Sequence, residues 1–163
     1  MRVTRLAILL AGLAAPAWLH AQHAGHDAHH AASDSAFRAL QARGARVMGV
    51  DQYTSSHRFE LLRDGGRIAL ERDVDDSAGA ERIRAHLRDV AARLAKGDFS
   101  LSEQVHATEI PGARTLAAKG SAVRYAFRPL ARGGEVRITS DDAAAVRAVH
   151  DFLAFQRREH RSP

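Results

Sequence analysis

Residues 57–94, HRFELLRDGGRIALERDVDDSAGAERIRAHLRDVAARL, decide the fold. Apolar and charged side chains alternate on both sides of Asp64-Gly65-Gly66, which is the period-two pattern of half-buried antiparallel strands. The turn sequence supplies residues that tolerate the positive φ angles of a tight hairpin. We therefore expect a β-hairpin with one apolar face and one charged face.

A helix signal follows the hairpin. Asp75-Asp76-Ser77 offers side chains that accept hydrogen bonds from the free amides of a helix start. The apolar residues after it fall at i, i+4, i+7 and i+11, and Gly97 is a natural stop. These apolar positions are Ile83, Leu87, Val90 and Leu94. The stretch as a whole predicts a ββα unit.

Residues 123–156 repeat this plan. Alternating apolar positions flank a predicted turn at 131–134, and Ser140-Asp141-Asp142 precedes a second helical stripe. An offset of 66 residues superposes the helix signals and leaves the Gly pairs two residues apart, as expected if the second turn is longer. The similarity indicates either a duplication or a shared ββα pattern.

The simplest architecture is an α+β domain over residues 35–160, with a four-stranded antiparallel sheet and two helices on its apolar face. Ser33-Asp34-Ser35, followed by Phe37 and Leu40, adds a short N-terminal helix with Gly44 as its expected interruption. Residues 99–120 have weak periodicity, so they predict only a turn with a short strand or helical turn.

Residues 1–21 have the features of a secretory signal. Arg2 and Arg5 precede an apolar run that is too short to span a bilayer, and Leu19-His20-Ala21 fits a cleavage site. We predict a periplasmic or secreted protein that is not integral to the membrane after cleavage. Loss of two Arg from the 24 basic residues leaves about three more basic than acidic residues, which argues against a nucleic-acid partner. The chain has no Cys, which excludes thiolate metal sites.

The segment 22–34 is a flexible tail rich in histidine. Neutral imidazoles are common ligands of Cu, Ni and Zn, and an Ala/Gly backbone lets several converge on one ion. The predicted ligands are His23, His26, Asp27, His29 and His30. The leading hypothesis is an exported, non-catalytic protein whose tail binds a transition metal. The alternative is a solvated linker that binds metal only adventitiously.

Two further functions stay open. One is an enzyme of unrecognised type around Asp51, Tyr53, His57 and His106, if the fold brings them together. His106 and Glu109 could share a metal if that turn is helical, and the alternative, which the lone pair favours, is a local hydrogen bond. The pattern predicts that His86 and His150 lie at the boundary of the core, each with a hydrogen-bond partner. It predicts that His160 is solvated.

The other open function is a ligand-binding or dimerisation module that uses the charged face of the sheet. Its residues would pair with a second copy or hold an anionic ligand. They are Arg58, Glu60, Arg67, Arg124, Arg128, Glu135 and Arg137.

Three segments carry a resemblance to a family: 48–57 (MGVDQYTSSH), Val105-His106 before Ile110-Pro111-Gly112, and 150–156 (HDFLAFQ). Here the chain resembles an uncharacterised family of small exported bacterial proteins, over residues 35–160. Some members carry the name aspartate carbamoyltransferase. The true carbamoyltransferases are larger cytoplasmic enzymes with two α/β domains and a Ser-Thr-Arg-Thr phosphate loop, which this sequence lacks. The resemblance therefore implies a fold family and transfers no functional residues.

Overall fold

The computed structural model describes residues 33–47, 49 and 51–162. Contacts within the chain divide it into two units, 1–35 and 36–163. The fold described below belongs to the second unit. The predicted signal sequence and nearly all of the His-rich tail lie outside the described residues. Within the described part, no helix is both long and apolar enough to cross a membrane.

The second unit has the predicted α+β content. After helix α1 (33–47), the elements run in the order η1 (Gln52–Thr54), β1 (Ser55–Leu62), β2 (Gly65–Arg72), α2 (Ser77–Leu94), α3 (Ser100–His106), α4 (Ala113–Lys119), η2 (Gly120–Ala122), β3 (Val123–Leu130), β4 (Gly133–Ser140) and α5 (Ala143–Glu159).

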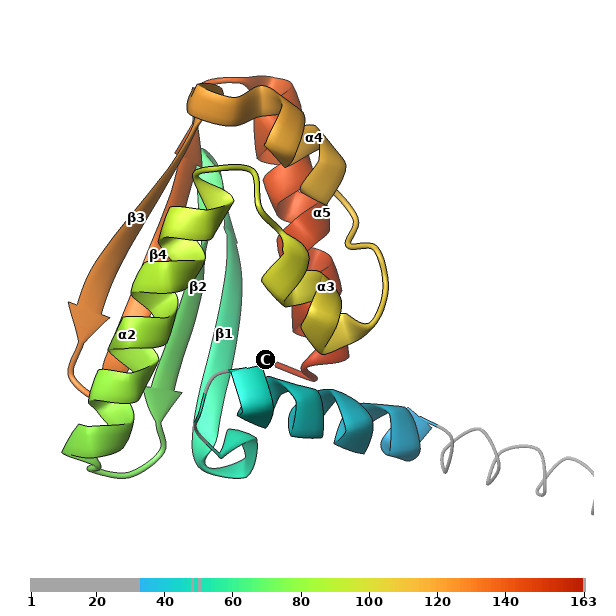
Figure 1. Cartoon of the computed structure of the whole chain (residues 1–163). Coiled ribbons are helices and arrows are strands. Elements are labelled where there is room, and N and C mark those ends of the chain that lie inside the picture. Colours follow the sequence, from blue (N-terminus) through green and yellow to red (C-terminus); the bar gives the residue numbers. More distant parts are fainter. Residues whose placement is uncertain (1–32, 48, 50, 163) are drawn as a thin grey trace, which may run out of the picture. The chain divides into compact units, whose positions relative to one another are not determined.

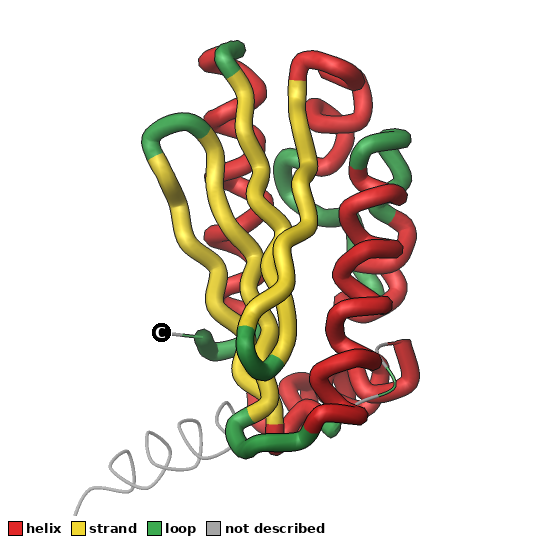
Figure 2. The backbone as a smooth tube through the Cα atoms, turned by 90° about the vertical axis from the view of Figure 1, so that its left-hand side faces the viewer, coloured by secondary structure: helices red, strands yellow, loops and turns green. Residues whose placement is uncertain are grey.

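The four strands form one antiparallel sheet in the order β1-β2-β4-β3 (Figure 1). Helices α2 and α5 pack on its apolar face, where α2 contacts mainly β4 and β3 and α5 contacts mainly β1 and β2. Each long helix therefore covers the hairpin of the other ββα unit. Figure 2 shows the strands as one twisted layer with helices beside it. The predicted architecture is confirmed.

The strand register places the two units about a local pseudo-twofold axis. Ile68 pairs with Val136, and these two residues occupy equivalent positions when the hairpins are superposed with an offset of 68. Both hairpins have two-residue turns, so the prediction of a longer second turn was wrong. The strands of the two units are offset by 68 residues and their helices by 66. This difference arises in the connection from strand to helix, which is residues 73–76 in the first unit and the shorter 141–142 in the second.

The paired glycines serve close packing more than turn geometry. Of the four, only Gly65 has a positive φ, of 137°. A Cβ on Gly133 would lie 2.0 Å from the Leu70 carbonyl oxygen, and one on Gly66 would lie 2.1 Å from Leu153 Cδ1. The glycines therefore allow β2 and β4, and the helix above them, to approach closely.

The predicted helix starts are confirmed. Asp76 accepts a hydrogen bond from the Gly79 amide, and Asp142 accepts from the amides of Ala144 and Ala145. The prediction of an interruption at Gly44 was wrong, because α1 runs through this residue to 47. The weakly periodic segment forms α3 and α4, which is more helix than its sequence pattern predicted.

Candidate functional site: an imidazole-lined cavity

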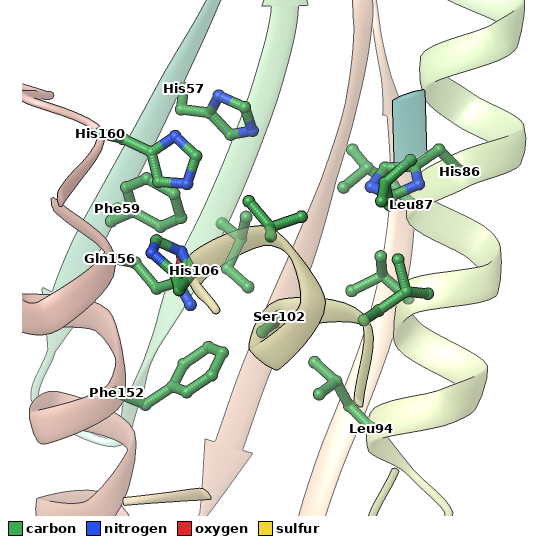
Figure 3. Close-up of a pocket in the computed structure, with 15 residues that line it drawn as sticks. His57, Phe59, His86, Leu87, Leu94, Ser102, His106, Phe152, Gln156 and His160 are labelled. Atoms are coloured by element: carbon green, nitrogen blue, oxygen red, sulfur yellow. The ribbon is translucent and has the colours of Figure 1, made fainter. Parts of the chain in front are cut away.

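A cavity of about 70 Å³ lies between the sheet, α2, α3 and α5 (Figure 3). Four of the residues that line the cavity are histidines, and no aspartate, glutamate, lysine or arginine lines it. The polar lining residues are His57, His86, His106, His160, Ser102 and Gln156, and the remainder are aliphatic or phenylalanine. We call this site the imidazole cavity.

His57 reaches the cavity from β1. The alternation of a strand places it on the same face as Phe59, which is buried in the core. The two rings are stacked, with centroids 5.5 Å apart and planes 5° apart. The apolar pattern that folds the hairpin thus also directs this imidazole inward.

His160 follows the last turn of α5, and its ring lies between the rings of His57 and His106. Its ring centroid is 4.6 Å from that of His57 and 5.2 Å from that of His106. Its position continues a spacing of four residues from Phe152 and Gln156, which puts all three on one helix face. The prediction of a solvated His160 was wrong, because this stripe continues into the charged end of the chain.

His106 is buried at the end of α3, and its Nε2 lies 2.7 Å from Oε1 of the buried Gln156. The other ring nitrogen, Nδ1, is buried without a hydrogen-bond partner in the described structure. Arg43 Nε donates to the Val105 carbonyl at 2.6 Å, which ties α3 to α1. The hydrogen bond to Gln156 thus fixes the orientation of the His106 ring.

The cavity keeps its imidazoles uncharged at neutral pH. Burial lowers the pKa of His57 to about 4, with smaller contributions from His86 and His106. Burial also lowers the pKa of His86 to about 4. For His160, burial and then His57 and His106 lower the pKa to about 2. Burial lowers the pKa of His106 as well, against the opposing effect of the Gln156 hydrogen bond.

The fold does not use the ring nitrogens of three of these histidines. Among the described residues, the rings of His57, His86 and His160 have no hydrogen-bond partner. By contrast, His150 Nε2 donates to the Leu62 carbonyl at 2.9 Å, as predicted for a boundary histidine. His86 is half-buried, which fits the predicted boundary position, but it faces the cavity and lacks the predicted hydrogen-bond partner among the described residues. Unused donors and acceptors next to a cavity are available to a ligand.

A polar hollow of about 300 Å³ lies on the other side of His57 and His160, which line both spaces. Residues from α1, η1, β1 and the end of the chain complete it: Gln41, Gln52, Ser55, Ser56, Arg58, Arg161 and Ser162. The two imidazoles therefore stand between the inner cavity and this outer hollow.

The residues of the predicted enzyme site are only partly brought together. His57 and His106 line the same cavity, as that hypothesis required. Asp51 instead accepts a hydrogen bond from the Tyr53 amide at 2.9 Å, and the Tyr53 side chain is 66% exposed. Neither residue lines the cavity.

The condition for a metal shared by His106 and Glu109, a helical turn that includes both, is not met. Helix α3 ends at His106, and Ala107 turns the chain with a left-handed φ of 57°. Glu109 is exposed and forms an ion pair with Arg114 at 2.8 Å.

The charged face of the sheet neutralises many of its own charges. Arg67 forms ion pairs with both Glu60 and Glu135. Arg58 pairs with Glu71 at 2.8 Å, and Arg137 pairs with Asp64. A dimer or anion site on this face stays a prediction.

In the described ranges 33–47, 49 and 51–162, no group of three or more His, Asp or Glu side chains could hold a metal ion. The predicted tail ligands lie outside those ranges: His23, His26, Asp27, His29 and His30. No family model, no curated protein and no solved structure matches the chain. The family resemblance therefore stays a prediction.

Proposed function

We propose that this is an exported binding protein without catalytic activity, and that the imidazole cavity is its ligand site. The observation that carries the proposal is the set of neutral histidines around an uncharged cavity, with ring nitrogens that the fold leaves unused. Pockets that bind small ligands are mostly apolar and have a few convergent polar groups. The imidazole cavity has this composition.

The pKa values favour binding over acid–base catalysis. A general acid or base works best when its pKa lies near the working pH. Burial lowers the pKa of His57 and of His86 to about 4, so at neutral pH very few of these rings are in the imidazolium form that acts as a general acid, and the neutral form is a weak base. Their neutral nitrogens remain able to accept a hydrogen bond or coordinate an ion.

The lining also restricts the ligand. A charged organic group would lose its hydration in this cavity without gaining an opposite charge. The volume of about 70 Å³ restricts the ligand to a few heavy atoms. We therefore expect a small uncharged molecule, or an ion that imidazole nitrogens can coordinate.

Acetamide and acetate are matched probes for this site, because they have the same shape and differ in charge. In a titration followed by imidazole ¹H–¹³C NMR, acetamide or xenon should shift the signals of His57, His106 and His160. Acetate should shift them less, and His150 should not respond because its ring bonds to a carbonyl outside the cavity. If none of these probes shifts the cavity signals, the proposal is overturned.

A cavity-filling variant provides a second readout. Val90→Phe adds bulk on the α2 wall and should abolish the acetamide and xenon shifts. Val74→Phe makes the same substitution at a side chain that is 62% exposed outside the cavity, and it should leave the shifts unchanged. Circular dichroism would check that both variants fold.

Transition-metal binding by the His-rich tail is the second candidate. It is supported by four histidines and one aspartate within eight residues. The test titrates Cu(II), Ni(II) and Zn(II) into the full chain and into a variant with alanine at the four tail histidines, His23, His26, His29 and His30. A lower stoichiometry in the variant supports the tail site, and equal stoichiometry removes it.

Export is tested separately from binding. Cleavage after Ala21 would give a protein that begins at Gln22 in the periplasmic or secreted fraction. N-terminal analysis of that fraction should find this start, and recovery of the whole chain from the cytoplasm would contradict export.

A further inference from the structure

The polar groups on one side of the imidazole cavity point to a class of ligand, and this inference rests on the proposed function. We propose that His106 and Gln156 together recognise a small uncharged molecule that both donates and accepts a hydrogen bond, such as a primary amide or an alcohol. The two residues are then the specificity determinants of the site.

His106 and Gln156 each keep one polar atom that the fold does not use. Gln156 Oε1 lies 2.7 Å from His106 Nε2. Gln156 Nε2 and His106 Nδ1 are both buried without a hydrogen-bond partner in the described part of the chain. The two residues are only 5% and 9% exposed, so bulk solvent does not supply the partners. A buried polar group without a partner destabilises the folded state, and a ligand that supplies both partners removes that penalty.

The contact between the two residues fixes the role of each unused atom. An amide oxygen only accepts hydrogen bonds, so His106 Nε2 donates to Gln156 Oε1 and carries the proton of the neutral ring. His106 Nδ1 is then an acceptor, and Gln156 Nε2 is a donor. Turning the amide over reverses both roles and still leaves one donor and one acceptor. We call His106 and Gln156 the donor–acceptor pair, because a ligand that satisfies both must accept one bond and donate another.

The fold holds the donor–acceptor pair in place before a ligand binds. The ring of His106 contacts Phe155 edge-on, with centroids 5.0 Å apart, and its centroid is 5.2 Å from that of His160. Arg43 Nε donates to the carbonyl of the preceding residue, Val105, at 2.6 Å. Little side-chain freedom is therefore left to lose on binding, which favours affinity.

The opposite side of the cavity is apolar. Leu87 and Leu94 on α2 lie across the cavity from the donor–acceptor pair (Figure 3). The volume of about 70 Å³ leaves room for only a few heavy atoms between them. The ligand therefore has a small polar head at the donor–acceptor pair and a short hydrocarbon tail toward α2.

Acetamide and acetone test this inference, because they have the same shape and both accept a hydrogen bond, whereas only acetamide donates one. Water solvates acetamide more strongly, so a cavity without a donor–acceptor pair would prefer acetone. In titrations of the full chain followed by imidazole NMR, acetamide should bind roughly tenfold more tightly than acetone. Propan-2-ol, which has the acetone skeleton with a hydroxyl group, should also bind more tightly than acetone. Acetone affinity that equals or exceeds that of acetamide overturns the inference.

The ¹⁵N signals of the His106 ring provide a direct readout in the unsubstituted chain. Acetamide should shift the signal of Nδ1 more than that of Nε2, because Nε2 keeps its bond to Gln156. The ring of His150, which bonds to the Leu62 carbonyl, should not respond. Binding of acetamide without a response at His106 Nδ1 would show that this atom does not contact the ligand, and the inference would fail.

Two substitutions each remove one member of the pair of unused atoms. Gln156→Met keeps the length of the side chain and removes its amide, and His106→Gln keeps an amide near the position of Nε2 and removes Nδ1. Each should reduce the preference for acetamide over acetone from roughly tenfold to about threefold or less. His150→Gln is the matched control on α5 and should keep the full preference. A full preference in both Gln156→Met and His106→Gln contradicts the assignment of the donor–acceptor pair.

The outcomes separate this inference from the proposed function. If acetone and xenon shift the cavity signals and acetamide has no advantage over acetone, the cavity is a ligand site and the selection by the donor–acceptor pair is overturned. If acetamide, acetone and xenon all leave the cavity signals unchanged, both the inference and the proposed function fail.

Discussion

The two ββα units have the same frame but place different side chains beneath it. His57 in the first hairpin corresponds to Tyr125 in the second, whereas Phe59 corresponds to Phe127. The frame therefore accepts an aromatic ring at either position and does not require histidine. This difference is why we assign the first unit's imidazole to function and its phenylalanine to the core.

The second unit closes its inner face with aromatic packing. Phe127 packs against the core, and the Arg88 guanidinium lies 4.7 Å from its ring centroid. Burial raises the pKa of Tyr125 to about 12, and its hydroxyl is buried without a partner among the described residues. The first unit instead receives His106 from α3, which lies between the two units in the chain. The first unit thus has imidazoles at the place where the second unit has closely packed aromatic rings.

The largest expected effect tests whether the two frames are equivalent. A Cβ at Gly133 would lie 2.0 Å from the Leu70 carbonyl oxygen, and at the matching Gly65 it would lie 2.3 Å from that of Ile138. We expect Gly133→Val and Gly65→Val each to lower the free energy of unfolding by about 4 kcal/mol or more. Urea denaturation would measure this. A loss below about 1 kcal/mol in either variant would contradict the equivalence.

A smaller effect tests the difference between the units. Folding lowers the pKa of His57 and His86 to about 4 and that of His160 to about 2, from the ordinary histidine value of 6.5. Below pH 6.5 the unfolded chain therefore binds more protons than the folded chain. Stability is therefore full above pH 6.5 and is lost as the pH falls. With a discount for partial exposure, we expect a loss on the order of 3 kcal/mol between pH 7 and pH 5.

The matched variant for this acid effect is His57→Phe, which makes the first unit resemble the second. It should reduce the loss by about a quarter to a third, because it removes one of the four histidines whose pKa burial lowers, and at His106 the Gln156 hydrogen bond opposes that lowering. Urea denaturation at several pH values measures both proteins. A free energy of unfolding that stays constant from pH 7 to pH 5 in the unsubstituted chain would show that the histidines are not buried as described.

The smallest effect concerns the second unit alone. Tyr125→Phe removes a buried hydroxyl that has no partner among the described residues, so we expect a gain of about 1 kcal/mol in the free energy of unfolding. Phe127→Leu, a substitution on the same strand that removes no polar group, should instead lower stability. A loss of stability in Tyr125→Phe would indicate that the hydroxyl is hydrogen-bonded after all.

Most of the fold could be predicted because its signals are local. The alternation around Phe59 and Ile68 fixes which strand faces are buried, and Asp76 and Asp142 fix the helix starts. The pairing of β2 with β4 is not local, and so the register that pairs Ile68 with Val136 appeared only in the structure. The role of Gly133 was missed for the same reason, since its constraint comes from Leu70 in another strand.

The candidate site could be predicted only in part. The sequence points to His57 and His106 because each lies in or beside a stretch rich in polar side chains. The position of His160 depends on how far the α5 stripe extends and on which strand α5 covers. No sequence spacing encodes the meeting of residues 57, 106 and 160, because three separate elements bring them together.

The exchange of helices between hairpins has a consequence for how the chain matures. The first hairpin is covered mainly by α5, the last of the described elements in chain order, whereas α2 covers mainly β3 and β4, which follow it in the chain. Each ββα unit therefore buries its apolar face mainly against the other unit, and we expect neither unit to fold alone.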